Sequence, residues 1–580
     1  MSEGVALLDV REPSARYLAL AEPVLVRAFN QLACSTAGVE RLRQLIRSLA
    51  VQGRLLPQSS GDQPAANLVR SLREGRRLLL DAGRIRKERS SSEEVAALDF
   101  ELPRGWEVVQ LADAAWPQAG FAFKSSAFND VGQGLPLIRI RDVGSSSPTT
   151  YYAGEFREEF VVHKGDWLIS MDGDFRVAPW TGPDALLNQR VTRLVFFGDA
   201  VQPLYVCLAL QQELFKLQGT KAYTTVDHLS GGQIASRPIP LPPLAEQHRI
   251  VARVEELMKL CDALEGRGRL ADEQHARLTT TLFGLLAASE SPQALADHWQ
   301  RIAEHFDLLL DRPEAIDALE QVILELAVRG LLVNQEAGDE PASVLMAKVR
   351  ATKDQELAAG SLKRGKPTPP VDDTETPYAL PSGWCWVRLA EVVTKLGAGS
   401  TPLGGKDVYT STGIKFLRSQ NVWNDGLRVF DAARISSATH EGMAATVVKP
   451  NDLLFNITGA SIGRCALVPS DFDEANVSQH VTIVRPALVE TRHFLHLVLI
   501  SNHVQRTVRN VQVGVSREGL SIAKLGQFVV PLPPLAEQHR IVARVDELRR
   551  LCAQLRENLV AARQTQTRLA DALVAQAIAV

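Results

Sequence analysis

The chain has 580 residues, 45% of them hydrophobic and 23% charged, a composition that excludes disorder over most of its length. This length predicts about three or four domains rather than one core. The formal net charge of −3 lacks the basic excess typical of nucleic-acid-binding proteins, so any DNA contact must come from local basic clusters or a more basic partner.

The first element, residues 1–100, is predicted to be a helical region. Its segment ERLRQLIRSLAVQGRLL (40–56) has helical periodicity and reaches Gly53, a residue type that commonly ends helices. A basic run follows at 70–89. Two interpretations stay open for this run: a solvated helix face, or contact with DNA phosphates or an acidic partner.

Residues 101–240 are predicted to form an α/β domain. The runs LIRIRDV (137–143), HKGDWLISMDG (163–173) and LNQRVTRLV (187–195) are alternating or apolar and rich in β-branched residues. Glycine, aspartate and proline bound them, as is typical of strands.

Residues 241–290 are predicted to form a long helix. Apolar residues step by four and three along it, at Ile250, Val254, Leu257, Cys261 and Leu264, and the same frame reaches Leu278 and Leu285. This heptad pattern favours a coiled coil, with a helix buried in a bundle as the alternative. Gly266 and Gly268 leave a local kink open.

Residues 291–378 are predicted to be a central helical region with a linker. The helical segment ALEQVILELAVRGLL (318–332) reaches Gly330, and the stretch 349–373, with its lysines, glycines and prolines, indicates an exposed linker. Residues 379–531 are predicted to be a second α/β domain. Residues 532–580 are predicted to be a second long helix, whose heptad positions are Ile541, Val545, Leu548, Cys552 and Leu555, with the frame continuing to Leu569.

The second half repeats the first. PLPPLAEQHRIVARVEEL (240–257) recurs at 531–548 with one Glu/Asp change, at an offset of 291. LPRGW (102–106) answers LPSGW (380–384) at 278, and LAVQGRLLPQSSGDQPA (49–65) answers LAVRGLLVNQEAGDEPA at 277. The offset grows along the chain, so the second copy has gained residues between its Gly-Trp start and its PLPP end. The predicted fold is a mixed α+β class with two homologous α/β domains, joined by coiled-coil helices in a pseudo-two-fold repeat.

No catalytic motif is recognisable, and the chain is predicted to be non-catalytic. No methyltransferase or nuclease signature is present, and six scattered cysteines without a CxxC pair predict neither a zinc site nor a disulfide framework. His248 and His539 have no second ligand at metal spacing, so an interface or capping role is preferred. No signal peptide or membrane-length apolar run is found, which predicts a soluble cytoplasmic protein.

The GW-x-x-V-x-L motif before each variable domain, the PLPPLAEQHRIV helix after it and the two-fold repetition resemble the specificity subunits of type I restriction–modification systems, in the longer subfamily with an extended N-terminal region. The resemblance implies that 101–240 and 379–531 are target recognition domains, each reading half of a bipartite, asymmetric double-stranded DNA site. It implies that the helices set the spacer and dock two methyltransferase subunits, which hold S-adenosylmethionine. Restriction/translocase subunits would bring ATP and Mg²⁺, and this chain would bind no cofactor, metal or membrane.

Candidate DNA-binding residues are the polar side chains within the matched strand–loop segments, because Arg, Asn, Gln, Ser and Thr read base edges and phosphates. Arg139 aligns with Arg418 and Gln189 with Gln479, which predicts shared positioning, whereas the difference between Arg141 and Gln420 favours base reading. For each residue a structural or solvated role stays open. The candidates are Arg139, Arg141, Arg176, Asn188, Gln189 and Arg190 in the first domain, and Arg418, Ser419, Gln420, Asn421, Asn456, Thr458, Ser461, Arg464, Ser478, Gln479 and His480 in the second.

Two other functions are compatible with the sequence. The low net charge favours a coiled-coil tethering protein whose domains bind protein, although two divergent domains on a nearly invariant scaffold do not. An enzyme with an unrecognised site is the second alternative.

Overall fold

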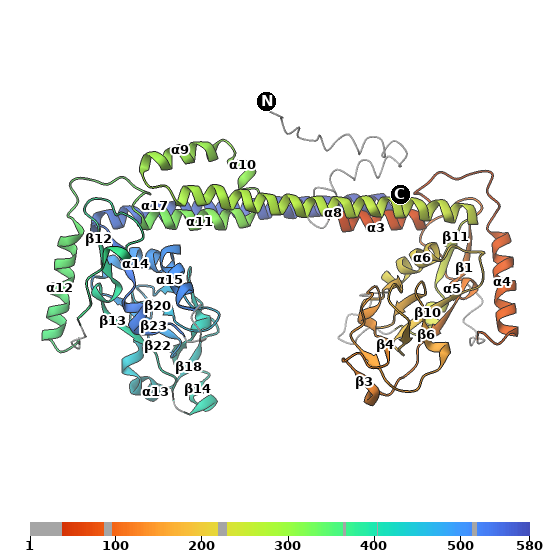
Figure 1. Cartoon of the computed structure of the whole chain (residues 1–580), viewed down its shortest axis with the longest axis horizontal. Helices are drawn as coiled ribbons and strands as arrows, with labels where there is room; N and C mark the ends of the chain where they lie inside the picture. Colours follow the sequence, from red (N-terminus) through yellow and green to blue (C-terminus); the bar gives the residue numbers. More distant parts are fainter. Residues whose placement is uncertain are drawn as a thin grey trace. The chain divides into compact units, whose positions relative to one another are not determined.

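The computed structural model describes residues 38–85, 95–217, 229–362, 367–402, 404–512 and 519–579. The chain divides into two compact units, residues 1–270 with 563–580, and residues 271–562. Each unit contains one α/β domain together with helices (Figure 1). The fold is of the mixed α+β class, as predicted. Residues 1–37 and 86–94 of the predicted N-terminal helical region lie outside the described part.

The α/β domain of the first unit contains three sheets. A four-stranded sheet has the order β2-β10-β7-β8, a five-stranded sheet the order β3-β5-β4-β9-β6, and β1 pairs with β11. In the five-stranded sheet β4 and β9 are parallel, and the other neighbours are antiparallel. The strands are β1 (Glu107–Gln110), β2 (Ala115–Ala119), β3 (Phe128–Asn129), β4 (Leu135–Ile138), β5 (Tyr151–Tyr152), β6 (Val161–Val162), β7 (Trp167–Ser170), β8 (Val177–Pro179), β9 (Ala185–Leu187), β10 (Val191–Phe196) and β11 (Pro238–Leu241).

The second unit repeats these sheets with one addition. Its orders are β13-β23-β20-β21 and β14-β18-β15-β22-β19, with β12 paired to β24, and β16 and β17 form an extra hairpin. The strands are β12 (Cys385–Arg388), β13 (Val393–Ala398), β14 (Tyr409–Thr410), β15 (Ile414–Leu417), β16 (Val422–Trp423), β17 (Gly426–Leu427), β18 (Ala433–Ile435), β19 (Val447–Val448), β20 (Leu453–Asn456), β21 (Cys465–Leu467), β22 (Ala475–Val477), β23 (Val481–Pro486) and β24 (Val529–Leu532). The strands predicted within 137–143, 163–173 and 187–195 are confirmed by β4, β7 and β10.

The extra length of the second copy is spread along its α/β domain. The offset between the starts of equivalent strands is 279 for β4 and β15, 286 for β6 and β19, and 290 for β9 and β22. The largest gain therefore falls between the first and second of these strand pairs. That stretch of the second copy contains the β16–β17 hairpin and helix α13 (Ser437–Gly442).

Helices cover the sheets and build the scaffold. In the first unit they are α3 (Gly38–Val51), α4 (Ala66–Asp81), α5 (Leu111–Ala114), α6 (Pro203–Phe215) and α7 (Gly231–Ala235). In the second unit they are α9 (Pro292–Ala303), α10 (Phe306–Leu309), α11 (Pro313–Val328), α12 (Ala342–Ala358), α14 (Arg492–Ile500), α15 (Asn502–Gln512) and α16 (Ile522–Gly526). The predicted exposed linker at 349–373 is wrong at its start, because α12 runs to Ala358 and buries Val349 at 2% exposure.

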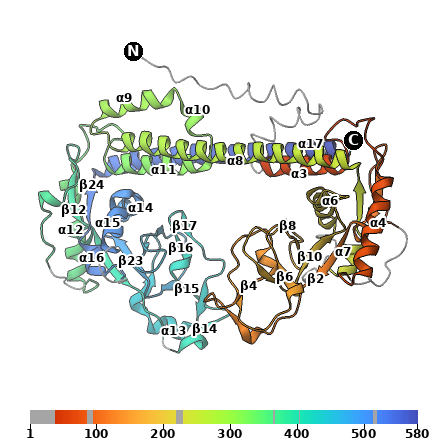
Figure 2. The ribbon, with the colours of Figure 1, turned by 45° about the vertical axis from the view of Figure 1, so that its right-hand side comes forward.

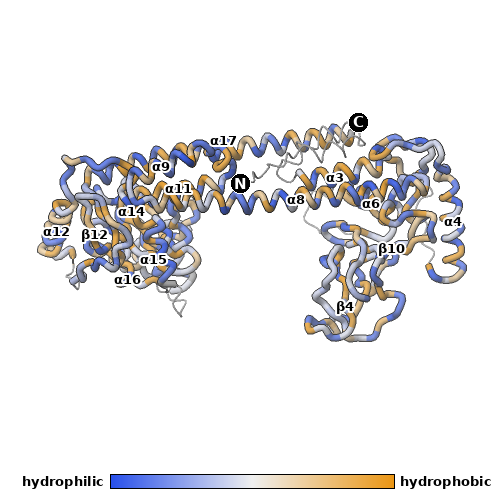
Figure 3. Tube along the Cα trace, turned by 45° about the horizontal axis from the view of Figure 1, so that its top comes forward, coloured by the Kyte–Doolittle hydropathy of each residue, from blue (hydrophilic) through white to orange (hydrophobic). Residues whose placement is uncertain are grey.

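The two long helices are α8 (Leu244–Ala287) and α17 (Leu535–Ala579), and α8 stays helical through Gly266 and Gly268. In the first unit the heptad residues of α8 pack against α3 and the C-terminal turns of α17. In the second unit those of α17 pack against α11 and the C-terminal turns of α8. In each unit the heptad residues therefore contact a shorter helix as well as the other long helix. Apolar and polar residues alternate along these helices (Figure 3).

The heptad frame is wrong beyond four heptads. Leu278 and Leu569 are 52% and 49% exposed, whereas the next residues, Thr279 and Ala570, are buried. An α-helix of 3.6 residues per turn drifts by about 20° per heptad relative to a 3.5-residue repeat, or about 80° over four heptads. This drift is close to the rotation of one residue, so the buried stripe moves to the following position in both helices.

The three repeated sequence motifs meet at one cluster in the first unit. Trp106 Nε1 donates to Glu246 Oε2 (3.1 Å), and Gln58 Nε2 donates to Glu246 Oε1 (2.8 Å). Arg249 forms a bidentate pair with Asp62, at 3.1 and 2.5 Å. Glu246 is 1% exposed, and burial raises its pKa while the two hydrogen bonds oppose that rise.

The second unit contains the same cluster. Trp384 Nε1 donates to Glu537 Oε2 (2.9 Å), and Gln335 Nε2 donates to Glu537 Oε1 (3.0 Å). Arg540 forms the bidentate pair with Asp339, at 3.2 and 2.6 Å. The motifs are therefore repeated because they lock the start of each long helix to the Gly-Trp segment and to the loop after the shorter helix.

Candidate nucleic-acid interface

Three turns carry the candidate residues of the first domain. Turn 1 (139–143) follows β4, turn 2 (171–176) follows β7, and turn 3 (188–190) follows β9. Turns 1 and 3 leave the carboxyl ends of two parallel, hydrogen-bonded strands, where Ile138 pairs with Leu187. Met171 N donates to Arg190 O (3.1 Å), which joins turn 2 to turn 3.

The second domain presents the corresponding turns. Turn 1 is 418–422, turn 2 is 457–464 and turn 3 is 478–480. Ser478 N donates to Leu417 O (2.9 Å), and Ile457 N donates to His480 O (3.0 Å), the counterpart of the bond between turns 2 and 3 in the first domain. The structure therefore brings the candidates of each domain together on three adjacent turns, with the exception of Asn456, which is the last residue of β20. Strands β4 and β15, which lead into turn 1 of the first and the second domain, are labelled in Figure 2.

Turn 1 has the same local geometry in both domains. Arg139 N donates to Asp142 Oδ2 (2.8 Å), and Arg418 N donates to Asn421 Oδ1 (2.9 Å). Each bond closes a short 3₁₀ turn directly after a buried strand end, so the arginine is the first residue to leave the sheet. The predicted equivalence of Arg139 and Arg418 is seen in the fold.

Many candidates present side chains that reach the surface. The exposed ones are Arg139, Arg141, Arg176, Gln189, Arg190, Gln420, Gln479 and His480. The half-buried ones are Asn188, Arg418, Ser419, Thr458, Ser461 and Arg464. Some of these already have partners: Arg190 pairs with Asp172 (3.2 Å), and Thr458 Oγ1 bonds His480 Nδ1 (2.6 Å).

Three candidates are buried within the second domain. Asn421 Nδ2 donates to Arg428 O (2.7 Å), and Asn456 Nδ2 donates to Ser419 O (2.8 Å). Ser478 is 4% exposed at the start of turn 3. The amides of Asn421 and Asn456 thus stabilise turn 1 from within the fold, and none of the three side chains faces solvent.

Sequence reasoning missed one tryptophan at this interface. Trp423 is 39% exposed and follows turn 1, and the guanidinium of Arg464 lies 3.7 Å from the centre of its ring. Trp423 Nε1 donates to Gln420 O (2.9 Å). The signal was available, because Asn424-Asp425-Gly426 is rich in turn-forming residues, and the structure uses Asn424 and Asp425 as the two-residue loop between β16 and β17.

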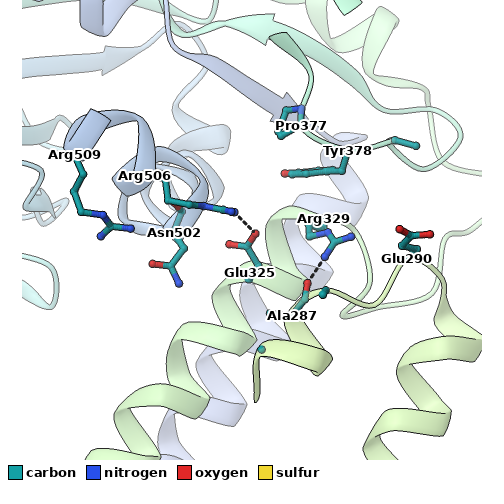
Figure 4. Close-up of a pocket in the computed structure, with 12 residues that line it drawn as sticks. Ala287, Glu290, Glu325, Arg329, Pro377, Tyr378, Asn502, Arg506 and Arg509 are labelled. Atoms are coloured by element: carbon teal, nitrogen blue, oxygen red, sulfur yellow. Dashed lines mark hydrogen bonds and ion pairs between the residues drawn. The ribbon is translucent and has the colours of Figure 1, made fainter. Parts of the chain in front are cut away.

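A polar pocket of about 850 Å³ lies elsewhere in the second unit, lined by α8, α11, α15 and residues 377–379. Arg506 pairs with the buried Glu325 at 3.1 Å, and Arg329 donates to the carbonyl of Ala287 at the end of α8 (Figure 4). None of the candidate DNA-binding residues lines this pocket.

Among the described residues no group of three or more His, Cys, Asp or Glu could hold a metal ion, and the five described cysteines are free thiols. None of the described helices has the length and apolarity needed to cross a membrane. His248 and His539 are exposed in the second turn of α8 and α17.

Two homologous domains with matching polar turns, on a duplicated helical scaffold, define the class of two-domain DNA-recognition subunits. The model of the type I restriction modification DNA specificity domain matches residues 103–272 and 381–561. The chain belongs to this family of type I restriction–modification specificity subunits, and its role is sequence-specific DNA recognition.

Individual relatives match along most of the chain. The EcoAI specificity subunit of Escherichia coli is 31% identical over 572 residues, which cover 93% of this chain and 94% of the relative. The EcoEI specificity subunit of Escherichia coli is 30% identical over 579 residues, with 93% and 94% covered. The HsdS subunit from Thermoanaerobacter tengcongensis has 17% identity, covers 83% of this chain and 98% of its own, and gives a TM-score of 0.36.

Proposed function

We propose that each domain reads one half of a bipartite DNA site through its three turns. The observation that carries the proposal is the equivalence of the turns. Both domains place them after equivalent strands, while the exposed side chains of the turns differ. Arg141 occupies the position of Gln420, and these residue types favour different base edges in the major groove. The equivalent Arg139 and Arg418 suit phosphates, which position the protein without reading sequence.

We further propose that the chain is non-catalytic and acts with partners. The repeated helices would dock two methyltransferase subunits carrying S-adenosylmethionine, and restriction/translocase subunits would supply the ATP- and Mg²⁺-dependent steps. The assembled complex would act on DNA, and we therefore expect it in the cytoplasm. Titrating S-adenosylmethionine into the isolated chain by calorimetry should give no binding heat, and saturable binding would overturn the non-catalytic assignment.

A domain exchange tests the division of labour. Residues 102–240 are replaced by the corresponding domain of another family member, the chain is co-expressed with its modification subunits, and host DNA is sequenced for methylated adenine. We expect one half of the recognised sequence to change and the other to persist. A change in both halves, or in neither, would contradict the proposal.

Two matched substitutions test the turns themselves. Arg139→Ala and Arg418→Ala should each weaken DNA binding of the assembled complex by about tenfold and lower the salt dependence by about one counterion, the effect of a lost phosphate contact. Arg301→Ala, on the exposed face of α9, is the control. Unchanged affinity for both turn variants would remove these residues from the interface.

A further inference from the structure

Arg176 and Arg464 occupy the same place in the two recognition domains. Arg176 directly precedes β8, and Arg464 directly precedes β21. Their carbonyls accept the same hydrogen bond, from Ser170 N (3.0 Å) in the first domain and from Asn456 N (2.9 Å) in the second. Both arginines therefore leave turn 2 from an identical backbone position.

The residue that supports the arginine differs between the domains. Val143 and Val422 are equivalent, and the next residue is Gly144 in the first domain and Trp423 in the second. Gly144 has φ +89°, a Cβ built on it would lie 3.3 Å from Arg176 Cδ, and Arg176 Nη1 donates to Val143 O (3.5 Å). The first arginine thus lies against backbone.

In the second domain the arginine lies on an aromatic ring instead. The guanidinium of Arg464 is 3.7 Å from the ring centre of Trp423, and Trp423 Nε1 is fixed by Gln420 O at 2.9 Å. Asn424 Oδ1 accepts from Cys465 N (3.0 Å), which ties the β16–β17 hairpin to the strand after Arg464. The position of the ring is therefore fixed by two bonds, one from its own Nε1 to Gln420 O and one between the next residue, Asn424, and Cys465 N.

The stack leaves the hydrogen-bonding capacity of Arg464 unused. Among the described residues, no hydrogen bond or ion pair engages the guanidinium of Arg464. A guanidinium stacked by its face on an indole keeps its N–H groups at the edge, oriented for a bidentate acceptor such as the O6 and N7 atoms of guanine. Stacking also restricts the Arg464 side chain to few rotamers, so less conformational entropy is lost when it binds DNA.

We propose that Trp423 is a positioning residue that orients Arg464 to read a base pair of the half-site assigned to the second domain, and that the Gly144/Trp423 difference makes the equivalent arginines read differently. The inference rests on the proposed function of the turns. Trp423 acts through Arg464, so its contribution should vanish when Arg464 is absent.

The test uses the complex of the full chain with its modification subunits, on duplexes carrying the site found by methylome sequencing of the wild type. Every base pair of both half-sites is substituted in turn, and affinities are measured for wild type, Trp423→Ala, Trp423→Phe, Arg464→Ala and Trp423→Ala/Arg464→Ala. The control is Trp299→Ala, which removes an exposed tryptophan of α9. The thermal midpoint of each variant is recorded in parallel.

We expect Trp423→Ala and Arg464→Ala to lose about tenfold or more in discrimination at the same base pair of one half-site. Trp423→Phe should retain most of it, and the double variant should be no worse than Arg464→Ala. A loss spread equally over all sequences, or one that merely follows the thermal midpoint, would show a structural role and overturn the inference.

The positioning role of Trp423 and the proposed function of the turns can be refuted separately. If Arg464→Ala changes one base pair and Trp423→Ala changes none, the positioning role is refuted while the proposed function stands. If neither changes any base pair and the domain exchange leaves the recognised sequence intact, the proposed function itself is refuted.

Discussion

Trp106 donates its indole N–H to the carboxylate of Glu246 at 3.1 Å, and the partners are 140 residues apart. The bond is reproduced between Trp384 and Glu537 at 2.9 Å. It explains why a Gly-Trp motif before each domain and a Glu in each PLPPLAEQ motif are both repeated. The two residues join the beginning and the end of a recognition domain at the first turn of a long helix.

Removing the indole donor should destabilise the first unit. Trp106→Phe leaves a buried oxygen of Glu246 without its partner, which costs about 1–3 kcal/mol of unfolding free energy. The bond favours the ionised carboxylate, so the loss should be larger at pH 8 than at pH 4. Urea denaturation followed by circular dichroism measures it.

Trp384→Phe should behave in the same way, because it removes the same bond. Trp116→Phe, at a half-buried tryptophan of β2, is the control and should cost less. Equal losses for Trp106→Phe and Trp116→Phe would assign the effect to ring size and not to the hydrogen bond.

Gly53 is required both by its backbone and by its neighbours. It has φ +71°, and a Cβ there would lie 2.4 Å from Pro103 Cγ and 2.9 Å from Trp106 Cζ2. Gly105 has φ +85° with open space around it. Gly105→Ala should therefore cost only the left-handed backbone strain, about 1–2 kcal/mol, while Gly53→Ala adds a clash of roughly 1–3 kcal/mol.

Thermal denaturation of the two variants separates strain from clash. The second unit offers a replicate, because Gly330 (φ +73°, Pro381 Cγ at 2.5 Å) and Gly383 (φ +85°, Pro534 Cγ at 3.7 Å) form the same pair. Similar thermal midpoints for Gly53→Ala and Gly105→Ala would mean that Pro103 and Trp106 move aside at little cost in free energy.

The two copies carry one ion-pair site with reversed charges. Arg43 of α3 pairs with Asp262 and Glu265 of α8, each at 2.7 Å. In the second unit Arg556 of α17 pairs with Asp317 and Glu320 of α11, at 2.5 and 3.2 Å. Glu320 takes the place of Arg43 at an offset of 277, and Arg556 takes the place of Glu265 at 291, the offsets of the repeat.

This reversal disfavours packing α3 on α17 or α11 on α8 at these positions, where like charges would meet. Arg43→Glu should cost about 1–2 kcal/mol at low salt, because two partly exposed pairs become repulsive. The triple change Arg43→Glu/Asp262→Lys/Glu265→Arg should recover most of that loss. Raising NaCl to about 1 M should shrink the loss, and a salt-independent loss would point to packing instead.

His496 should make the second unit sensitive to acid. Burial lowers the pKa of His496 to about 4, and its Nε2 bonds the carbonyl of Cys465 at 2.9 Å. The folded state thus holds neutral imidazole, while the unfolded chain takes a proton near pH 6.5. Stability is therefore present above pH 6.5 and is lost as the pH falls towards 4, by at most about 3 kcal/mol.

Unfolding free energies measured from pH 7 to pH 4 test this slope. His496→Gln keeps a polar side chain without the titration and should flatten the curve. The ring pairs Trp106–Tyr205 and Trp384–Phe494 are equivalent, which puts Cys207 at the place of His496, so the first unit has no histidine at this position. An unchanged slope in His496→Gln would assign the acid sensitivity to other groups.

The sequence by itself determined the repeat, the strand pairs, the long helices and the family. These depend on local pattern: heptad spacing, β-branched runs and glycine ends such as Gly53 and Gly330, both of which follow helix ends with positive φ. Offsets between copies then located the two α/β domains without any contact information. At Leu278 and Leu569 the heptad frame failed because a small drift per heptad had accumulated to about one residue.

Only the tertiary structure decided which polar side chains reach the surface. Asn421 and Gln420 are neighbours of similar chemistry, yet Asn421 is buried on Arg428 O and Gln420 is exposed. The stack of Arg464 on Trp423 joins residues far apart in the chain, and no periodicity encodes it. Burial and stacking depend on which loops the sheet order brings together, so the scaffold could be predicted from local pattern while the reading surface required the assembled fold.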